Sequence, residues 1–229
     1  FDSISGFMRG KDDMGNFRTP FDPLHASHRN DDYCEGNAWQ YTWLVPHDIE
    51  GLAGLFGGKA RMLARLDSLF LQPSELGEEA SPDISGMIGQ YAHGNEPSHH
   101  ILYLYAMLGH PERTSEMVHH VLNTLYDDTP DGLCGNEDVG QMSAWYVLAS
   151  LGLYQVEPAS GRYWISQPLF ERATLKVPGG TFTIKCPKRP VSANPRPRIL
   201  LNGAPHSMPY ISYEDIVKGG TLTFQWEEE

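Results

Sequence analysis

Three short acidic loops contain the residues of this chain best suited to catalysis. The first holds Glu35, the second Glu96 and the third Glu137–Asp138. In each loop, glycine and asparagine flank the carboxylate, and an aromatic or apolar segment follows directly. This layout places carboxylates at the beginning of a buried helix. We therefore interpret the three loops as parts of one site.

Two carboxylates on either side of a bond are what glycoside hydrolysis needs, one as acid and one as base. Glu35 is the candidate acid, because the neighbouring Trp39 and Tyr41 predict poorly solvated surroundings, which raise the pKa of a carboxyl group. Asp138 is the candidate base that activates water. A structural alternative remains for both loops: Glu35 would interact with free N–H groups at a helix N-terminus, and Glu137 with Asp138 would form an N-cap cluster.

The segment Gly94–His100 combines oxygen ligands with imidazoles. Oxygen donors such as Asn95 and Glu96 suit calcium. Zinc would use one of the two adjacent histidines, but neighbouring side chains on a helix point about 100° apart and no HExxH motif is present. The segment 127–138 has oxygen residues at an EF-hand-like spacing, but a proline interrupts it and its last ligand is Asp, which disfavours an EF-hand.

The composition is that of a globular protein with a neutral partner. The 229 residues are 40% hydrophobic, which is enough for a sizeable core. The formal net charge of −12 argues against nucleic acid and anionic membranes as partners and is compatible with sugars. The sequence contains no GxSxG, GxGxxG or P-loop motif, and its three cysteines include no CxxC pair.

Hydrophobic periodicity predicts helices first and strands afterwards. Apolar residues three to four apart predict helices at 37–45, 59–70, 98–108, 112–126 and 141–151. The last of these is apolar nearly all round, which predicts burial on most sides. Near Val156 the period changes to two and predicts a hairpin that turns at Gly179–Gly180, with further strands at 198–201 and 221–226. Residues 1–32 and 71–86 are predicted to be irregular.

Helices followed by strands in separate blocks indicate two domains or an α+β arrangement. We predict a mainly α fold, with a helical domain at residues 1–155 and a β-rich region at residues 156–229. Paired helices with loops at one end are typical of a helical barrel or bundle.

Together, these motifs resemble the calcium-dependent exo-acting α-mannosidases of glycoside hydrolase family 92. The resemblance follows the chain in order through 35–41 (EGNAWQY), 47–52, 94–100, 129–138 running into 140–146, 151–154 and 201–203. It departs from the family pattern at Asn136, where many relatives have a second Asp. The family's N-terminal β-sandwich and early barrel helices are not in this sequence.

The resemblance implies a fold and a reaction. Residues 1–155 would be the C-terminal part of an (α/α)6 helical barrel, followed by a small antiparallel β region. The reaction would be the removal of terminal α-linked mannose, with α-1,2 as the expected linkage, and with inversion at the anomeric carbon. By motif, Glu35 matches the general acid and Asp138 the general base.

The resemblance also implies partners. Calcium would be the cofactor, with Asn95, Glu96 and Asp138 as metal ligands. The implied substrate-binding residues are Trp39, His99 and Glu137. The partners would be a mannose-containing oligosaccharide, as in N-glycan degradation, and the missing N-terminal portion of the same enzyme. A periplasmic or secreted location follows from this substrate class.

Two alternatives stay open at this stage. The chain could be a non-catalytic, calcium-dependent carbohydrate-binding or structural fragment, whose acidic loops serve calcium and stability only. It could also belong to another barrel glycosidase or a lyase, although a lyase would more often use basic or Tyr/His chemistry.

Overall fold

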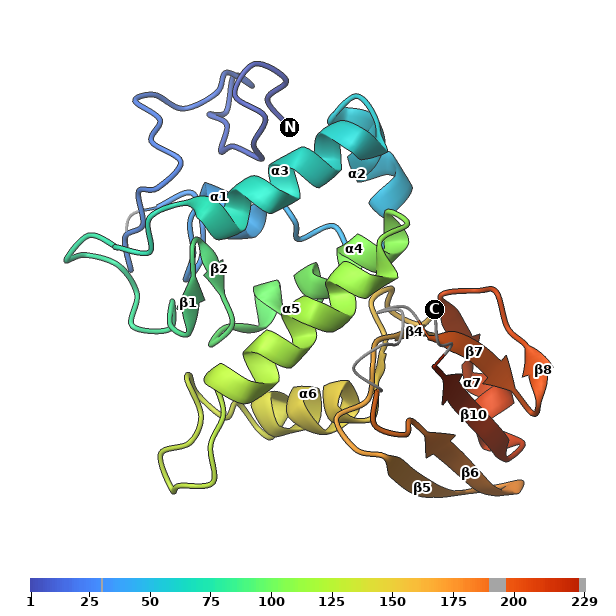
Figure 1. The fold of residues 1–229 in the computed structure, drawn as a ribbon. Coiled ribbons are helices and arrows are strands. Elements are labelled where there is room, and N and C mark those ends of the chain that lie inside the picture. Colours follow the sequence, from blue (N-terminus) through green and yellow to red (C-terminus); the bar gives the residue numbers. More distant parts are fainter. Residues whose placement is uncertain (30, 190–196, 227–229) are drawn as a thin grey trace. The chain divides into compact units, whose positions relative to one another are not determined.

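The computed structural model describes residues 1–29, 31–189 and 197–226 (Figure 1). The chain forms two compact units. The first consists of residues 1–101 and 124–142, and the second of residues 102–123 and 143–229. All the candidate site residues named above belong to the first unit. The predicted domain boundary at residue 155 stays a prediction.

The first unit contains helices α1 to α3 and a small hairpin. α1 spans Ala38–Tyr41, α2 Ile49–Leu55 and α3 Lys59–Leu71. β1 (Met87–Ile88) pairs antiparallel with β2 (Tyr91–Ala92), and the 3₁₀ helix η1 (Glu96–Ser98) follows. The next 3₁₀ helix, η2 (Ile101–Tyr103), begins at the last residue of this part of the unit. α3 confirms the helix predicted at 59–70. Its buried residues Met62, Leu66 and Leu69 lie three to four positions apart, on one face.

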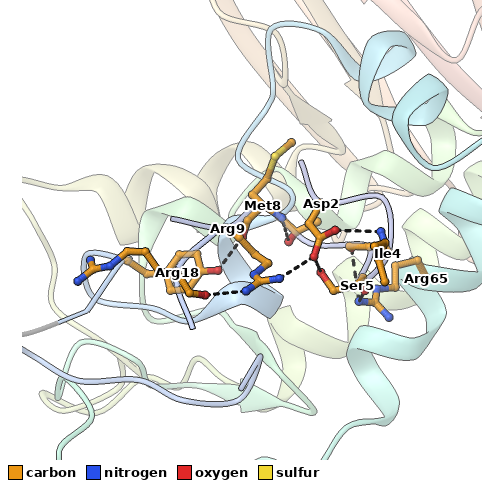
Figure 2. Close-up of polar contacts among 10 residues, drawn as sticks. Asp2, Ile4, Ser5, Met8, Arg9, Arg18 and Arg65 are labelled. Atoms are coloured by element: carbon orange, nitrogen blue, oxygen red, sulfur yellow. Dashed lines mark hydrogen bonds and ion pairs between the residues drawn. The ribbon is translucent and has the colours of Figure 1, made fainter. Parts of the chain in front are cut away.

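An ion-pair network holds the irregular N-terminal segment in place (Figure 2). The Asp2 carboxylate accepts hydrogen bonds from Ile4 N (3.0 Å), Ser5 Oγ (2.7 Å) and Arg9 Nη1 (2.7 Å). The hydrogen bond from the Ser5 hydroxyl, followed by the one from Arg9, holds the pKa of Asp2 well below its usual range. Arg65 of α3 donates to Ser5 O at 3.3 Å, so the segment is also tied to that helix.

Two of the predicted helices are shorter or broken in the structure. The helix predicted at 37–45 is the single turn α1. The helix predicted at 98–108 is broken into η1, η2 and α4 (Leu104–Met107). Residues 98–106 are all buried. Packing contacts therefore determine the backbone conformation of this segment, and it has no exposed face of the kind that an amphipathic helix presents. α2 was not predicted because two glycines interrupt its short apolar pattern; Asp48 caps it by accepting from Gly51 N at 2.8 Å.

The second unit joins α4, most of α5 and α6, and the later strands. α5 spans Pro111–Thr124 and α6 Gln141–Ser150; they are followed by β3 (Leu153–Tyr154), β4 (Arg162–Ile165), β5 (Arg172–Val177), β6 (Gly180–Lys185), β7 (Arg198–Leu201), β8 (Ala204–Pro205), β9 (Tyr210–Ser212), α7 (Tyr213–Val217) and β10 (Gly220–Gln225). One sheet has the order β5-β6-β10-β7-β8 (Figure 1). The other has the order β3-β4-β9. Phe182, Leu222 and Phe224 are at most 1% exposed in the core of this region.

The sheets correct the predicted fold class. Helices and strands are mixed among the described residues, so the fold is not mainly α. The β region is not wholly antiparallel, because β10 pairs parallel with β6, with Leu222 opposite Ile184. A parallel pair needs a long crossover, and the chain supplies one through β7, β8, β9 and α7. The predicted hairpin is present as β5 and β6, but Val177 pairs with Gly180, so its turn is Pro178–Gly179.

α6 confirms the helix predicted at 141–151 but not its predicted burial. Met142, Trp145 and Ala149 are buried, whereas Ser143, Ala144 and Val147 are exposed. The exposed positions are mostly small, so the uniform apolar pattern overstated how much of the helix is covered. Among the described residues, no helix has both the length and the apolar character needed to cross a membrane.

Candidate active site

The loop with Glu35 is held by the capping of α1. Asn37 is the N-cap: its Oδ1 accepts from Trp39 N and Gln40 N. Gln40 Oε1 in turn accepts from Asn37 N at 2.7 Å. Both side chains bind Gln90 in the turn between β1 and β2, where Asn37 Nδ2 donates to its Oε1 and Gln40 Nε2 to its backbone oxygen, each at 2.8 Å. The capping residue is therefore Asn37, and Glu35 stands outside the helix.

Glu35 is exposed and has a left-handed backbone, with φ +53°. The poorly solvated surroundings predicted for it are absent, because its side chain is exposed, whereas Trp39 is only 5% exposed in the core. The Trp39 ring meets Phe7 edge-on at 5.0 Å, and Arg65 Cζ lies 4.3 Å from its centroid. A ring packed in this way offers no open face for stacking on a sugar. Trp39 therefore has a core position, and its predicted substrate contact stays a prediction.

Asn95 joins the second acidic loop to the first. It is 6% exposed, and its Nδ2 donates to Glu35 O at 3.0 Å. This bond uses only the amide nitrogen, so the side-chain oxygen can serve as a ligand. Glu96 follows as the first residue of η1 and is partly exposed. The acid candidate and one metal-ligand candidate are thus connected by a direct hydrogen bond.

The third loop, residues 126–142, is here called the acidic loop. Its backbone is left-handed at three consecutive residues, Asp138 (φ +44°), Val139 (φ +58°) and Gly140 (φ +92°). A left-handed conformation costs a non-glycine residue roughly 1–3 kcal/mol, and such strain persists where surrounding structure enforces it. Gln141 N donates to Asp138 O at 3.2 Å, so the strained turn leads directly into α6.

Small residues let the acidic loop approach its neighbours. A Cβ on Gly135 would lie 2.3 Å from Gly94 O, and one on Gly94 would lie 2.0 Å from Ser85 Oγ. Only glycine allows backbones to approach so closely. Asn136 Nδ2 donates to Asp83 Oδ1 at 2.8 Å, which fixes the same stretch from the other side. The loop therefore lies against the segment that carries Asn95 and Glu96.

Electrostatic interactions connect the carboxylates of the three loops. Burial raises the pKa of Glu96 above its usual value, and Asp138 and the charge of Glu35 raise it further. The structure thus gathers residues separated by up to about a hundred positions in the sequence. Acid–base chemistry and cation binding both use such a cluster.

His99 and Glu137 have different surroundings. His99 is 1% exposed; its Nε2 lies 3.0 Å from His93 O and its Nδ1 3.3 Å from Gln141 Nε2. Burial lowers the pKa of His99 to about 4. Both ring nitrogens of His99 have partners inside the protein, and its predicted substrate contact stays a prediction. Glu137 is partly buried and its carbonyl accepts from Met142 N at 3.3 Å, so its substrate role stays a prediction.

The donor chemistry of the cluster fits calcium in part. Asn95, Glu96 and Asp138 offer two carboxylates and an amide oxygen, which are hard ligands of the type that calcium prefers. Burial is the main cause of the raised pKa of Glu96, and a bound dication would favour the charged form of this carboxyl. Within the described ranges there is no group of three or more His, Cys, Asp or Glu side chains arranged to hold a metal. Calcium takes six to eight oxygen ligands, so water or substrate hydroxyls would have to complete the coordination.

Sequence reasoning missed three residues that build the site. Gln90 receives the α1 cap, while His93 and Tyr126 connect the second loop to the third. His93 is fully buried, and burial lowers its pKa well below the usual value. His93 stands just before Gly94–Asn95, which could have drawn attention to it. Its partner Tyr126 is 33 positions away, and no spacing rule predicts such a contact.

Comparisons with known proteins agree on one family of glycosidases. The model of the glycosyl hydrolase family 92 catalytic domain matches residues 1–228. A curated relative, described as an uncharacterized secreted glycosidase of Arthroderma benhamiae, is 32% identical over 196 residues, which are 82% of this chain and 23% of that protein.

Two solved structures from Bacteroides thetaiotaomicron are similar in fold. The family GH92 α-mannosidase BT3965, in complex with mannoimidazole, matches with a TM-score of 0.87 and 35% identity over 100% of this chain and 31% of its own. The family GH92 inverting mannosidase BT2199 matches with a TM-score of 0.82 and 36% identity over 99% and 32%. The chain spans between about a quarter and a third of the length of these relatives.

Proposed function

Because the chain belongs to glycosyl hydrolase family 92, we propose that the protein carrying it is an exo-acting α-mannosidase that hydrolyses terminal mannose with inversion. The observation that carries this proposal is the family match over residues 1–228, and Glu35, Glu96 and Asp138 all belong to one compact unit. The similar protein BT2199 is an inverting mannosidase, which supports the proposed stereochemistry.

Each of the two catalytic carboxyls has one task. Glu35 donates a proton to the glycosidic oxygen as the bond to the anomeric carbon breaks. Asp138 takes a proton from a water molecule that attacks the opposite face of the ring. Inversion needs room for that water, so the two carboxyls should lie roughly 6.5–9.5 Å apart in the complex with substrate. The exposed position of Glu35 leaves its carboxyl accessible to an incoming glycoside.

Calcium is the proposed cofactor, and Asn95, Glu96 and Asp138 are its proposed ligands from this chain. When bound, it would polarise and orient hydroxyls of the terminal mannose. Asn95 Nδ2 donates to Glu35 O at 3.0 Å. Asn95 therefore helps to hold the acid loop whether or not it also binds the ion.

The finer parts of the proposal concern substrate and location. We take α-1,2-linked mannose in oligosaccharides such as N-glycans as the substrate, and a secreted or periplasmic location. The description of the curated relative as a secreted glycosidase supports that location. Glu137 is kept as a proposed substrate contact, because it precedes Asp138 in the same loop.

The test uses the full-length protein that carries this chain. We expect it to release mannose from α-1,2-mannobiose, to lose that activity with a calcium chelator and to recover it when calcium is added back. Proton NMR of the first product should show the β-anomer. Glu35→Gln and Asp138→Asn should each lower kcat by about 10²–10⁴-fold, the usual size of a lost general acid or base.

A matched control makes the same change of charge at a carboxylate far in sequence from Glu35 and Asp138. Glu78→Gln removes one carboxylate in an exposed loop and should leave kcat unchanged. Hydrolysis by Glu35→Gln and Asp138→Asn at the parental rate would contradict the assignment. Calcium-dependent mannose binding in calorimetry, with no turnover by the full-length protein, would favour the carbohydrate-binding alternative.

A further inference from the structure

The acidic loop is closed at its base by a tyrosine hydroxyl. Tyr126 opens the loop and Met142 ends it, and the Tyr126 hydroxyl donates to Met142 O at 3.3 Å. Tyr126 also forms an isolated antiparallel bridge with Leu133, so the first half of the loop is a short hairpin. The three left-handed residues lie in the second half, between this hairpin and α6. The Tyr126 hydroxyl therefore joins the two ends of the segment that carries Asp138.

His93 connects this closure to the second loop. Its Nε2 lies 2.7 Å from the Tyr126 hydroxyl and its Nδ1 lies 2.7 Å from the Tyr91 hydroxyl. The His93 ring is fully buried and therefore lies between two tyrosine hydroxyls in a site without solvent.

The connection continues to the acid loop. Two residues after His93, Asn95 donates to Glu35 O at 3.0 Å. A second link runs in parallel, because the His99 ring lies between His93 O (3.0 Å) and Gln141 Nε2 (3.3 Å). The loops of the proposed acid and base are thus joined through buried imidazoles. Buried hydrogen-bonded groups are costly to leave unpaired, so such links hold their geometry firmly.

We propose that Tyr126 and His93 are positioning residues that hold the acidic loop in register with the Glu35 loop and thereby orient Asp138 toward the attacking water. This inference rests on the proposed function for its kinetic consequence, but the geometric part concerns the loop itself. Neither side chain needs to touch substrate. Their effect passes through the closure at Met142 and the strained turn at Asp138–Gly140.

The kinetic test removes one oxygen atom. Tyr126→Phe in the full-length protein keeps the ring and deletes only the hydroxyl. We expect kcat to fall on the order of 10-fold, with little change in KM, because a misplaced catalytic group lowers the rate more than the affinity. The fall should be equal for α-1,2-mannobiose and for an aryl α-mannoside with a good leaving group, because water activation does not depend on the leaving group.

The acid variant provides the contrast. Glu35→Gln should lose far more activity on mannobiose than on the aryl mannoside, since only the poor leaving group needs the proton. Azide should partly restore turnover of Tyr126→Phe on the aryl mannoside. It attacks the anomeric carbon in place of water, the bond to the aryl oxygen breaks, and the product is a β-mannosyl azide. Tyr213→Phe, the same change at an exposed tyrosine of the second unit, should leave all these rates unchanged.

A second readout needs no mannosidase activity. Hydrogen exchange of the full-length protein should be faster in peptides covering residues 132–142 of Tyr126→Phe than in the parent, and equal in peptides covering α3. Unchanged kcat on both substrates, or a loss confined to mannobiose, would overturn the inference. Equal exchange in the loop would overturn it as well. A parent without activity but with faster exchange in the variant would contradict the proposed function and leave the positioning intact.

Discussion

Acidification should destabilise this protein through His100. The side chain is 6% exposed, and its Nε2 donates to Trp43 O at 2.7 Å. Burial lowers the pKa of His100 to about 4, and the hydrogen bond to Trp43 offsets part of that effect. An unfolded histidine has a pKa of about 6.5. As the pH falls from 6.5 toward 4, the unfolded chain therefore takes up a proton that the folded chain refuses, and stability is lost in that window.

The size of the effect follows from the two pKa values. At pH 5 the unfolded side chain is protonated by roughly 30 to 1, whereas the folded one remains mostly neutral. Protonation therefore favours unfolding by about 30-fold, or about 2 kcal/mol, relative to neutral pH. Carboxylates also contribute to acid sensitivity, but they are the same in a parent and in a variant that changes only this histidine.

The variant His100→Gln isolates the contribution. Glutamine can donate to Trp43 O but does not titrate. Urea unfolding followed by tryptophan fluorescence at pH 7 and pH 5 should show that the loss of stability between these values is smaller by about 2 kcal/mol in the variant. His47→Gln, at an exposed position, should keep the parental difference. An equal loss in His100→Gln and the parent would refute the reasoning, whatever the stability of the variant at pH 7.

Two further predictions concern packing and buried hydrogen bonds. Gly135→Ala should lower the free energy of unfolding by about 1–3 kcal/mol, because its Cβ would lie 2.3 Å from Gly94 O; Gly54→Ala, with no atom within 4 Å of the new Cβ, should not destabilise. Thr114→Val should cost about 1–3 kcal/mol in thermal or urea unfolding, because Ala106 N donates to its hydroxyl at 2.9 Å and would be left buried without an acceptor. A stable Gly135→Ala would contradict the close approach, and Thr114→Ser, which keeps the hydroxyl, should be milder than Thr114→Val.

Local pattern was enough for the elements with one clear face. α3 and α5 lie where the sequence predicts them, because their buried residues recur every three to four positions on a single side. The hairpin of β5 and β6 follows from alternation with period two. The segment EGNAWQY also encodes its own structure, since Asn37 and Gln40 cap α1 reciprocally within four residues. Short-range signals of this kind need no partner elsewhere in the chain.

Only the tertiary structure brings the three carboxylate-bearing loops close to one another. The sequence indicates that Glu35, Glu96 and Asp138 lie in loops of similar composition, with glycine and asparagine beside the carboxylate. Residue spacing, however, gives no information on distances between residues about a hundred positions apart. Contacts that bring them together are long-range: Asn95 to Glu35 O, and the close approach of Gly135 to Gly94. The sequence alone therefore predicts the chemistry of the site and leaves its assembly open.

Burial also distinguishes residues whose type suggested function. Trp39 and His99 are side chains that often bind sugars, and both are nearly inaccessible here. The same tertiary packing replaces the predicted helix at 98–108 with shorter turns and pairs β10 parallel with β6. A sequence pattern predicts which side chains will be buried. Which partner each group then meets depends on chain segments that are distant in sequence, and only the folded structure specifies them.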